Sequence, residues 1–167
     1  CLLICAAVRV LQNSYRPSVE FHWFCPPPLQ EKRQITSDQI LVSFLSTHIM
    51  NELNGTLTYI DHYQDGVGGI DGINGATSVI VSPDGNHVYA AGFIDDAISV
   101  FARDSSSGVL TFVEVQKNNV DGVLGLKRVM AVEITPDGSH VYAVSWKNDA
   151  LSIFSRNVSS GSLTSLG

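Results

Sequence analysis

The feature that most constrains this chain is an ungapped internal repeat of 53 residues. Residues 55–107 and 108–160 are identical at 21 of 53 positions. The string Ser82-Pro-Asp-Gly85, for example, returns as Thr135-Pro-Asp-Gly138. A fixed period of this length indicates a row of equal structural units, each of which buries its apolar faces against its neighbours.

Each repeat reads as four short strands separated by turns. The strands are expected at 76–81, 87–91, 97–103 and 110–116, and the first three recur at 129–134, 140–144 and 150–156. Pro-Asp-Gly favours a tight turn because proline presets φ and glycine accepts a positive φ. A β-solenoid needs shorter rungs, and a sandwich would not repeat so regularly. The predicted fold is therefore all-β, a partial β-propeller of four-stranded antiparallel blades.

The repeat divides the chain into two unlike parts. Residues 50–167 form the predicted propeller segment, with an outer strand at 55–63, a full blade at 76–116 and most of a further blade at 129–167. Residues 1–49 form a predicted non-repeat leader, irregular or disordered, with a helix-like stretch near Ser37–Met50. Because Met50 is the first methionine, the leader is interpreted either as foreign sequence or as an ordinary N-terminal extension.

Charge and cysteine content limit the possible partners and compartments. The net charge is −6, and residues 51–167 alone carry −7, so their surface should repel the phosphates of nucleic acid. No apolar run is long enough to span a bilayer. All three cysteines lie at or before Cys25, and residues 2–8 are either the end of a truncated signal peptide or a stray apolar stretch. Without an intact signal peptide, both cytoplasmic and extracellular locations stay open.

One stretch of the repeat resembles a known family. The string from Val81 to Asp104, followed by Gly-Val-Leu-Thr-Phe-Val-Glu at 108–114, is similar to lactonase-type seven-bladed propellers, the 6-phosphogluconolactonase-like and YVTN-type repeats. The Gly/Asp-rich link Asp65–Ala76 is similar to bacterial members of that group. The resemblance covers 55–167 and implies seven blades, more than this chain holds. The expected partners are therefore the remaining blades of a larger propeller or other copies of the chain.

Departures from the repeat mark a candidate ligand-binding site. In a propeller, the link from outer to inner strand and the loop between second and third strands lie on the same rim. There the second repeat replaces Asn, Gly, Phe and Ile of the first with Lys127, Arg128, Trp146 and Lys147. Cations beside an indole could hold a sugar acid or its phosphate. The alternative is ordinary surface variation.

Acidic residues on the same rim form a candidate metal site. Carboxylates of Asp65, Asp71, Asp95 and Asp96, with carbonyls of the glycine-rich link, would suit Ca²⁺. Their spacing matches no EF-hand, and aspartate is also favoured in turns for its local hydrogen bonds. We therefore expect no cofactor and keep Ca²⁺ as the alternative. The histidines and arginines that recur between repeats are interpreted as structural, with Arg103 and Arg156 pairing with turn carboxylates.

Three functional hypotheses remain. The first is a repeat module that binds a small molecule or a protein. The second, implied only by the resemblance, is part of a carboxylic ester hydrolase acting on sugar lactones. The third is a structural extracellular repeat protein. Because the sequence has no Gly-x-Ser-x-Gly string, metal-spaced histidine cluster or phosphate loop, no catalytic residue is assigned, and this segment alone is not expected to be active.

Overall fold

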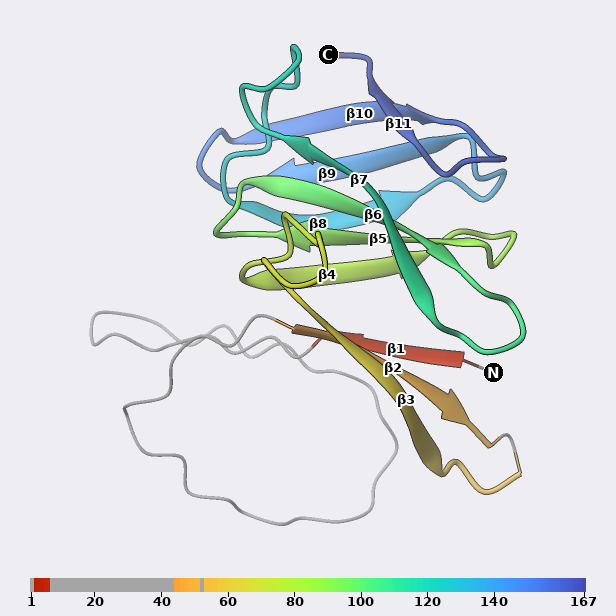
Figure 1. The fold of residues 1–167 in the computed structure, drawn as a ribbon. Helices are drawn as coiled ribbons and strands as arrows, with labels where there is room; N and C mark the ends of the chain where they lie inside the picture. Colours follow the sequence, from red (N-terminus) through yellow and green to blue (C-terminus); the bar gives the residue numbers. More distant parts are fainter. Residues whose placement is uncertain (1, 7–43, 52) are drawn as a thin grey trace, which may run out of the picture. The chain divides into compact units, whose positions relative to one another are not determined.

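A computed structural model describes residues 2–6, 44–51 and 53–167 of the chain. These residues form eleven strands in three antiparallel sheets (Figure 1). The described part of the chain contains no helix with the length and hydropathy needed to cross a membrane.

The second and third sheets are the two blades predicted from the repeat. The second has the order β4-β5-β6-β7, with β4 at Ala76–Val81, β5 at His87–Gly92, β6 at Ala97–Arg103 and β7 at Leu110–Lys117. The third has the order β8-β9-β10-β11, with β8 at Val129–Ile134, β9 at His140–Ser145, β10 at Ala150–Arg156 and β11 at Leu163–Ser165. The all-β fold of antiparallel four-stranded sheets is confirmed.

The first sheet consists of β1 (Leu2–Ala6), β2 (Phe44–Met50) and β3 (Leu57–Gln64), in that order. Its β2–β3 register matches that of β6–β7 one repeat later, including a bulge after Thr47 where the later pair has one after Val100. The helix-like interpretation of Ser37–Met50 is thus wrong over Phe44–Met50, because pairing with β3 overrides local propensity. The rest of that stretch lies outside the described residues.

Two apolar cores lie between successive sheets. The core between the first and second sheets contains Leu45, Tyr63, Val88 and Phe101, and the rings of Tyr63 and Phe101 lie 6.1 Å apart. The core between the second and third sheets contains the following buried side chains: Tyr89, Ile98, Val100, Leu126, Val141 and Phe154. The second sheet, which packs against both of the others, therefore buries side chains of both alternating sets, as the two-sided apolar strand pattern predicted.

A buried arginine joins the second and third sheets. The guanidinium of Arg156 in β10 donates to Asp84 Oδ2 at 2.7 Å and to the Tyr89 hydroxyl at 2.6 Å. The same guanidinium lies 2.9 Å from His87 Nδ1 and donates to the Gly138 carbonyl at 3.0 Å. We call this set of contacts the arginine latch. The predicted pairing of Arg156 with a turn carboxylate is therefore present, and the carboxylate belongs to the neighbouring blade.

Candidate functional site

Two kinds of connection lie at the same end of the sheets because neighbouring strands are antiparallel. They are the long links that join one sheet to the next and the loops between the second and third strands of each full sheet. We call residues 65–75, 93–96, 118–128 and 146–149 the loop rim. In the second sheet, Phe93 N–H donates to the Gly75 carbonyl at 3.1 Å. In the third sheet, Trp146 N–H donates to the Arg128 carbonyl, also at 3.1 Å. Each loop is thus fixed to the link of its own blade by equivalent bonds.

The loop rim brings a cation and two aromatic rings together. The guanidinium carbon of Arg128 lies 5.0 Å from the centre of the Phe93 ring. The Phe93 ring stacks on the Trp146 indole, with 6.3 Å between centroids and 13° between planes. The indole remains 65% exposed, so much of it is open to a ligand. Because Phe93 belongs to the second blade, this Phe93–Arg128–Trp146 stack bridges two blades.

Arg128 adopts a backbone conformation that arginine rarely takes. Its φ is +58°, and the equivalent residue of the previous repeat is Gly75, with φ +67°. A non-glycine residue in this region costs roughly 1 kcal/mol. Its N–H donates to Asp96 Oδ1 at 2.6 Å, which helps to hold the conformation. Backbone strain of this kind is concentrated at binding and catalytic sites.

The structure places the other predicted ligand-binding residues beside the stack. Lys127 and Lys147 are exposed, and Lys147 N–H donates to the Lys127 carbonyl at 3.2 Å. Phe93 was not among the predicted site residues. It occupies the repeat position of Trp146, in the loop between the second and third strands that the sequence places on the rim.

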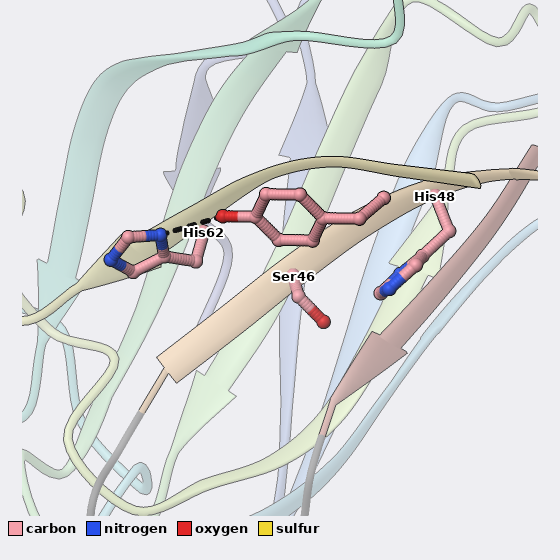
Figure 2. A pocket seen from close by; sticks show the side chains of 4 residues that line it. Ser46, His48 and His62 are labelled. Atoms are coloured by element: carbon pink, nitrogen blue, oxygen red, sulfur yellow. Dashed lines mark hydrogen bonds between the residues drawn. The ribbon is translucent and has the colours of Figure 1, made fainter. Parts of the chain in front are cut away.

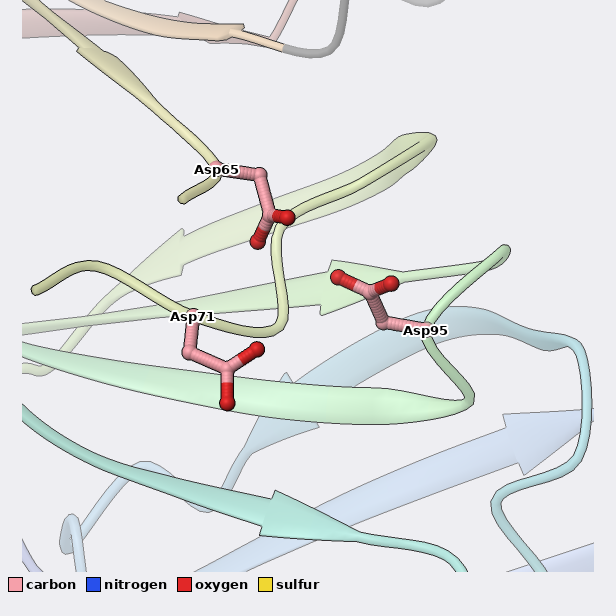
Figure 3. A group of neighbouring side chains, drawn as sticks. All are labelled: Asp65, Asp71 and Asp95. Atoms are coloured by element: carbon pink, nitrogen blue, oxygen red, sulfur yellow. The ribbon is translucent and has the colours of Figure 1, made fainter. Parts of the chain in front are cut away.

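Three of the four predicted metal-binding aspartates lie together. Carboxylate oxygens of Asp65, Asp71 and Asp95 fall within 4.8 Å of one another (Figure 3). A cation of the chain is already present, because Lys117 Nζ lies 2.8 Å from Asp71 Oδ1. The fourth residue, Asp96, contacts Arg128 instead. The three carboxylates could supply oxygen ligands to a cation only in competition with Lys117.

Two of these aspartates also perform a structural role that amides perform in the next repeat. Asp65 Oδ1 accepts from Ile73 N–H at 3.2 Å, as Asn118 Oδ1 accepts from Leu126 N–H at 3.0 Å. Asp95 accepts from Asn74 N–H at 3.0 Å. The amide at the same position of the third blade accepts from Lys127 N–H at 2.8 Å. The carboxylates thus add charge to bonds that do not require it.

The charges in this cluster shift their neighbours' pKa values. Desolvation, together with the nearby Asp65 carboxyl, raises the pKa of Asp95. The hydrogen bond to Asp71 raises the pKa of the Lys117 ammonium. Asp95 therefore has a stronger tendency than an ordinary aspartate to carry a proton, which is a property of acid–base groups as well as of crowded turns.

A second group of polar side chains lies on the first sheet. Ser46, His48, Tyr59 and His62 line a shallow pocket, and the Tyr59 hydroxyl lies 2.7 Å from His62 Nδ1 (Figure 2). The rings of His48 and Tyr59 meet edge to face at 5.7 Å, as those of Phe101 and Phe112 do one repeat later. The equivalent face of the second sheet packs against another blade, so we interpret this pocket as an inter-blade face.

Comparison with known proteins identifies the fold family. The model of the family described as lactonase, 7-bladed beta-propeller, matches residues 41–167. The chain belongs to this lactonase family. The match begins within the part that the sequence assigned to a leader and includes β2. Comparison with curated proteins finds no match.

Solved lactonase-like structures resemble the chain over three quarters of its length. A periplasmic gluconolactonase from Pseudomonas aeruginosa is 26% identical, with a TM-score of 0.63, and the match covers 76% of this chain and 34% of that protein. A putative 6-phosphogluconolactonase from Bacteroides fragilis is 23% identical, with a TM-score of 0.62 and coverages of 75% and 32%. The chain thus spans about a third of the length of these lactonase-family structures.

Proposed function

We propose that this chain is part of a hydrolase that opens sugar lactones, and that its loop rim binds an anionic group of the sugar, either a phosphate on the substrate or the carboxylate of the opened product. Membership of the lactonase family supports the reaction class. The similarity to the gluconolactonase of Pseudomonas aeruginosa supports a sugar lactone as the substrate class. Because the chain spans only part of these proteins, the proposal concerns the activity of a complete propeller.

The observation that carries the proposal is the Phe93–Arg128–Trp146 stack. An exposed indole offers an apolar face to the C–H groups of a sugar ring, and the adjacent guanidinium offers a planar pair of donors to a carboxylate or phosphate. Lys127 and Lys147 add positive charge to the same surface, on a segment that is otherwise acidic. Together these groups match an anionic sugar better than a neutral or cationic ligand.

A second candidate function is binding without hydrolysis. The stack contains a cation and two aromatic rings, and none of these groups is a nucleophile or a base that activates water. The same surface would therefore serve a module that only binds sugar acids. The two functions differ in turnover and agree on the residues that bind.

The proposal is tested by an assay of lactone hydrolysis. The assay uses the longest expressible form of the protein that contains residues 1–167. Proton release from glucono-δ-lactone and its 6-phosphate should exceed the uncatalysed rate. Arg128→Ala should raise KM for the 6-phosphate about tenfold or more, because a charge-assisted contact to the phosphate is lost, and should raise KM for the neutral glucono-δ-lactone less. Lys127→Ala should act in the same direction, and Val158→Ala, in the exposed turn after β10, should change neither kcat nor KM.

Binding of gluconate, followed by calorimetry, separates the two candidate functions. Binding without turnover that is lost in Arg128→Ala would support the module and exclude the hydrolase. Turnover that survives both Arg128→Ala and Lys127→Ala would show that substrate binds elsewhere. If the protein shows no turnover and no binding, both candidate functions are overturned.

A further inference from the structure

The main chain of the cationic pair Lys127–Arg128 is fixed on both sides. Lys127 N–H donates to Asn148 Oδ1 at 2.8 Å, and Arg128 N–H donates to Asp96 Oδ1 at 2.6 Å. The carbonyls of the pair accept from the backbone N–H groups of residues 146–147, at 3.1 and 3.2 Å. All four backbone polar groups of the pair are therefore bonded within the protein.

The charged side chains beside this main chain have no such partners. Among the described residues, the guanidinium of Arg128 and the ammonium groups of Lys127 and Lys147 take part in no hydrogen bond or ion pair. The guanidinium contacts the face of the Phe93 ring instead. A fixed main chain that carries unpaired charges can bind an anion with little loss of conformational entropy.

Asp96 joins the pair to the preceding blade. It lies in the loop between β5 and β6, with a φ of +56° that aspartate tolerates better than most residues. Its carbonyl accepts from Asn118 N–H at 3.0 Å, and its carboxylate accepts from Arg128 N–H. Asp96 is thus bonded to both ends of the link 118–128. Because the same loop carries Phe93, one short segment determines both where the Arg128 main chain lies and which ring its guanidinium contacts.

We propose that Asp96 is a positioning residue for the anionic group of the substrate. Its carboxylate holds Arg128 at a φ of +58°, so that the guanidinium stays over Phe93 and is presented to a phosphate or carboxylate. Without this acceptor, Arg128 would relax toward the negative φ that arginine prefers, and its side chain would leave the ring. Asp96 acts on the ligand only through Arg128. The inference rests on the proposed function, in which the loop rim binds an anionic group.

The alternative is that the bond from Arg128 N–H to Asp96 only closes the link. Both roles predict that the fold loses stability when the carboxylate is removed. Only a positioning role predicts that binding weakens for an anionic ligand more than for a neutral one. The test therefore compares the two lactones in the same protein, the form used to assay hydrolysis.

Asp96→Gly removes the acceptor and keeps the loop, because glycine accepts a positive φ. KM for the 6-phosphate should rise about fivefold with kcat unchanged, and KM for glucono-δ-lactone should change little. Asp96→Asn retains the Oδ1 acceptor and should restore KM to within about twofold of wild type. The matched control is Asp104→Gly, since Asp104 accepts from Ser106 and Ser107 N–H in a turn at the opposite end of the sheet. It should change neither KM.

A double variant shows whether Asp96 acts through Arg128. In the Arg128→Ala background, Asp96→Gly should raise KM for the 6-phosphate no further. A further rise would overturn the positioning role, and so would equal rises of KM for both lactones. If Arg128→Ala raises KM and Asp96→Gly does not, the positioning role fails and the proposed function stands. If Arg128→Ala itself has no effect, the anion site fails and the positioning role fails with it.

Hydrogen exchange gives a second measurement that needs no substitution and decides the case if Asp96→Gly does not fold. Saturating 6-phosphogluconate should slow exchange of the Arg128 amide about threefold, because the ligand and the bond to Asp96 favour the same conformation. The amide of Ser106, bonded to Asp104, should not respond. Binding that leaves exchange at Arg128 unchanged would overturn the positioning role, whereas absence of binding would overturn the anion site as well.

Discussion

Arg156 and Tyr89 are 67 residues apart in the chain, and the arginine Nε–H donates to the tyrosine hydroxyl across the boundary between two sheets. The Arg156 side chain is 1% exposed, and its charge is balanced by Asp84. Burial of a charge is tolerated only where partners satisfy it, and here every partner comes from a turn or strand that the repeat supplies. The stability of the packing between the second and third sheets therefore depends on residues that recur in the repeat.

Replacing Arg156 should destabilise the fold more than replacing its repeat equivalent. We expect Arg156→Gln to lower the free energy of unfolding by about 2–4 kcal/mol, because it leaves the buried hydroxyl of Tyr89 without its donor and breaks an ion pair. The half-buried side chain of Arg103 has one hydrogen bond among the described residues, to the Gly85 carbonyl, so Arg103→Gln should cost about 1 kcal/mol. Urea denaturation of the two variants measures the difference. Equal losses would show that the contacts across the sheets add nothing.

The arginine latch should also affect how the unfolding free energy changes with pH in acid. Desolvation opposes ionisation of the Asp84 carboxyl, but hydrogen bonds from Ser82 and Arg156 outweigh it and lower the pKa from 3.8 to about 2. A lowered pKa in the folded state stabilises the fold above pH 3.8, and this stabilisation is lost as the pH falls through about 2. Asp84→Asn should therefore flatten the dependence of unfolding free energy on pH between these values.

Arg156→Gln provides a site-specific check of the same cause. Carboxyl titration by NMR should show the pKa of Asp84 rising in this variant. The pKa of Asp137, also about 2, is lowered by bonds from Thr135 and Ser139 within its own turn and should stay unchanged. A pKa of Asp84 that does not move would show that the bonds from Ser82 and from Asn86 N–H within its own turn determine it.

The strands of the two full repeats could be predicted from the sequence because side chains and period agree there. The strand β2 could not, because its seven residues share only Ser46 with β6, although the backbone register is the same. Hydrogen bonds between backbones preserve the repeat where side chains have diverged. A repeat is recognised in a sequence by its side chains, so it predicted β3 of the first sheet as the outer strand at 55–63 but not β2.

Only part of the candidate site could be predicted, because the sequence marks a site residue only where it departs from the repeat. Arg128 and Trp146 stood out because each departs from its repeat equivalent. The partners of the rim residues come from distant positions: Phe93 from the preceding blade, and Lys117 from 46 residues beyond Asp71. Such pairs depend on how neighbouring blades and links lie in space, which one sequence does not reveal.

Neutralising Asp95 should stabilise the protein at neutral pH. Its pKa is raised by burial and by Asp65, so its contribution to stability is greatest below pH 3.8 and is lost as the pH rises through the folded-state pKa. Asparagine can keep the bond to Asn74 N–H, as Asn148 does to Lys127 N–H. We expect Asp95→Asn to add about 0.5–1 kcal/mol to the unfolding free energy at pH 7 and less at pH 3. Thermal unfolding at the two pH values measures this.

Calcium titration addresses the metal hypothesis with the same variant. Binding of Ca²⁺ by Asp65, Asp71 and Asp95 would raise the melting temperature of the wild-type chain with Ca²⁺ concentration, and Asp95→Asn would remove the effect. The ion pair between Lys117 and Asp71 competes with the metal. We therefore expect a small effect that grows in Lys117→Gln. A melting temperature that does not change with Ca²⁺ concentration in the wild type, in Asp95→Asn or in Lys117→Gln would exclude the site.

Gly161→Ala should be far more damaging than Gly55→Ala, although both glycines occupy the same repeat position. Both have positive φ, +78° and +71°, so alanine costs roughly 1 kcal/mol at either site. A Cβ on Gly55 meets no atom of the described residues within 4 Å, whereas a Cβ on Gly161 would collide with the ring of His87 in the neighbouring sheet. We expect a further loss of about 2 kcal/mol for Gly161→Ala, because the two sheets must separate or the buried ring must move. Denaturation midpoints of the two variants measure it. Equal midpoints would mean that the third sheet does not pack on the second as closely as this contact requires.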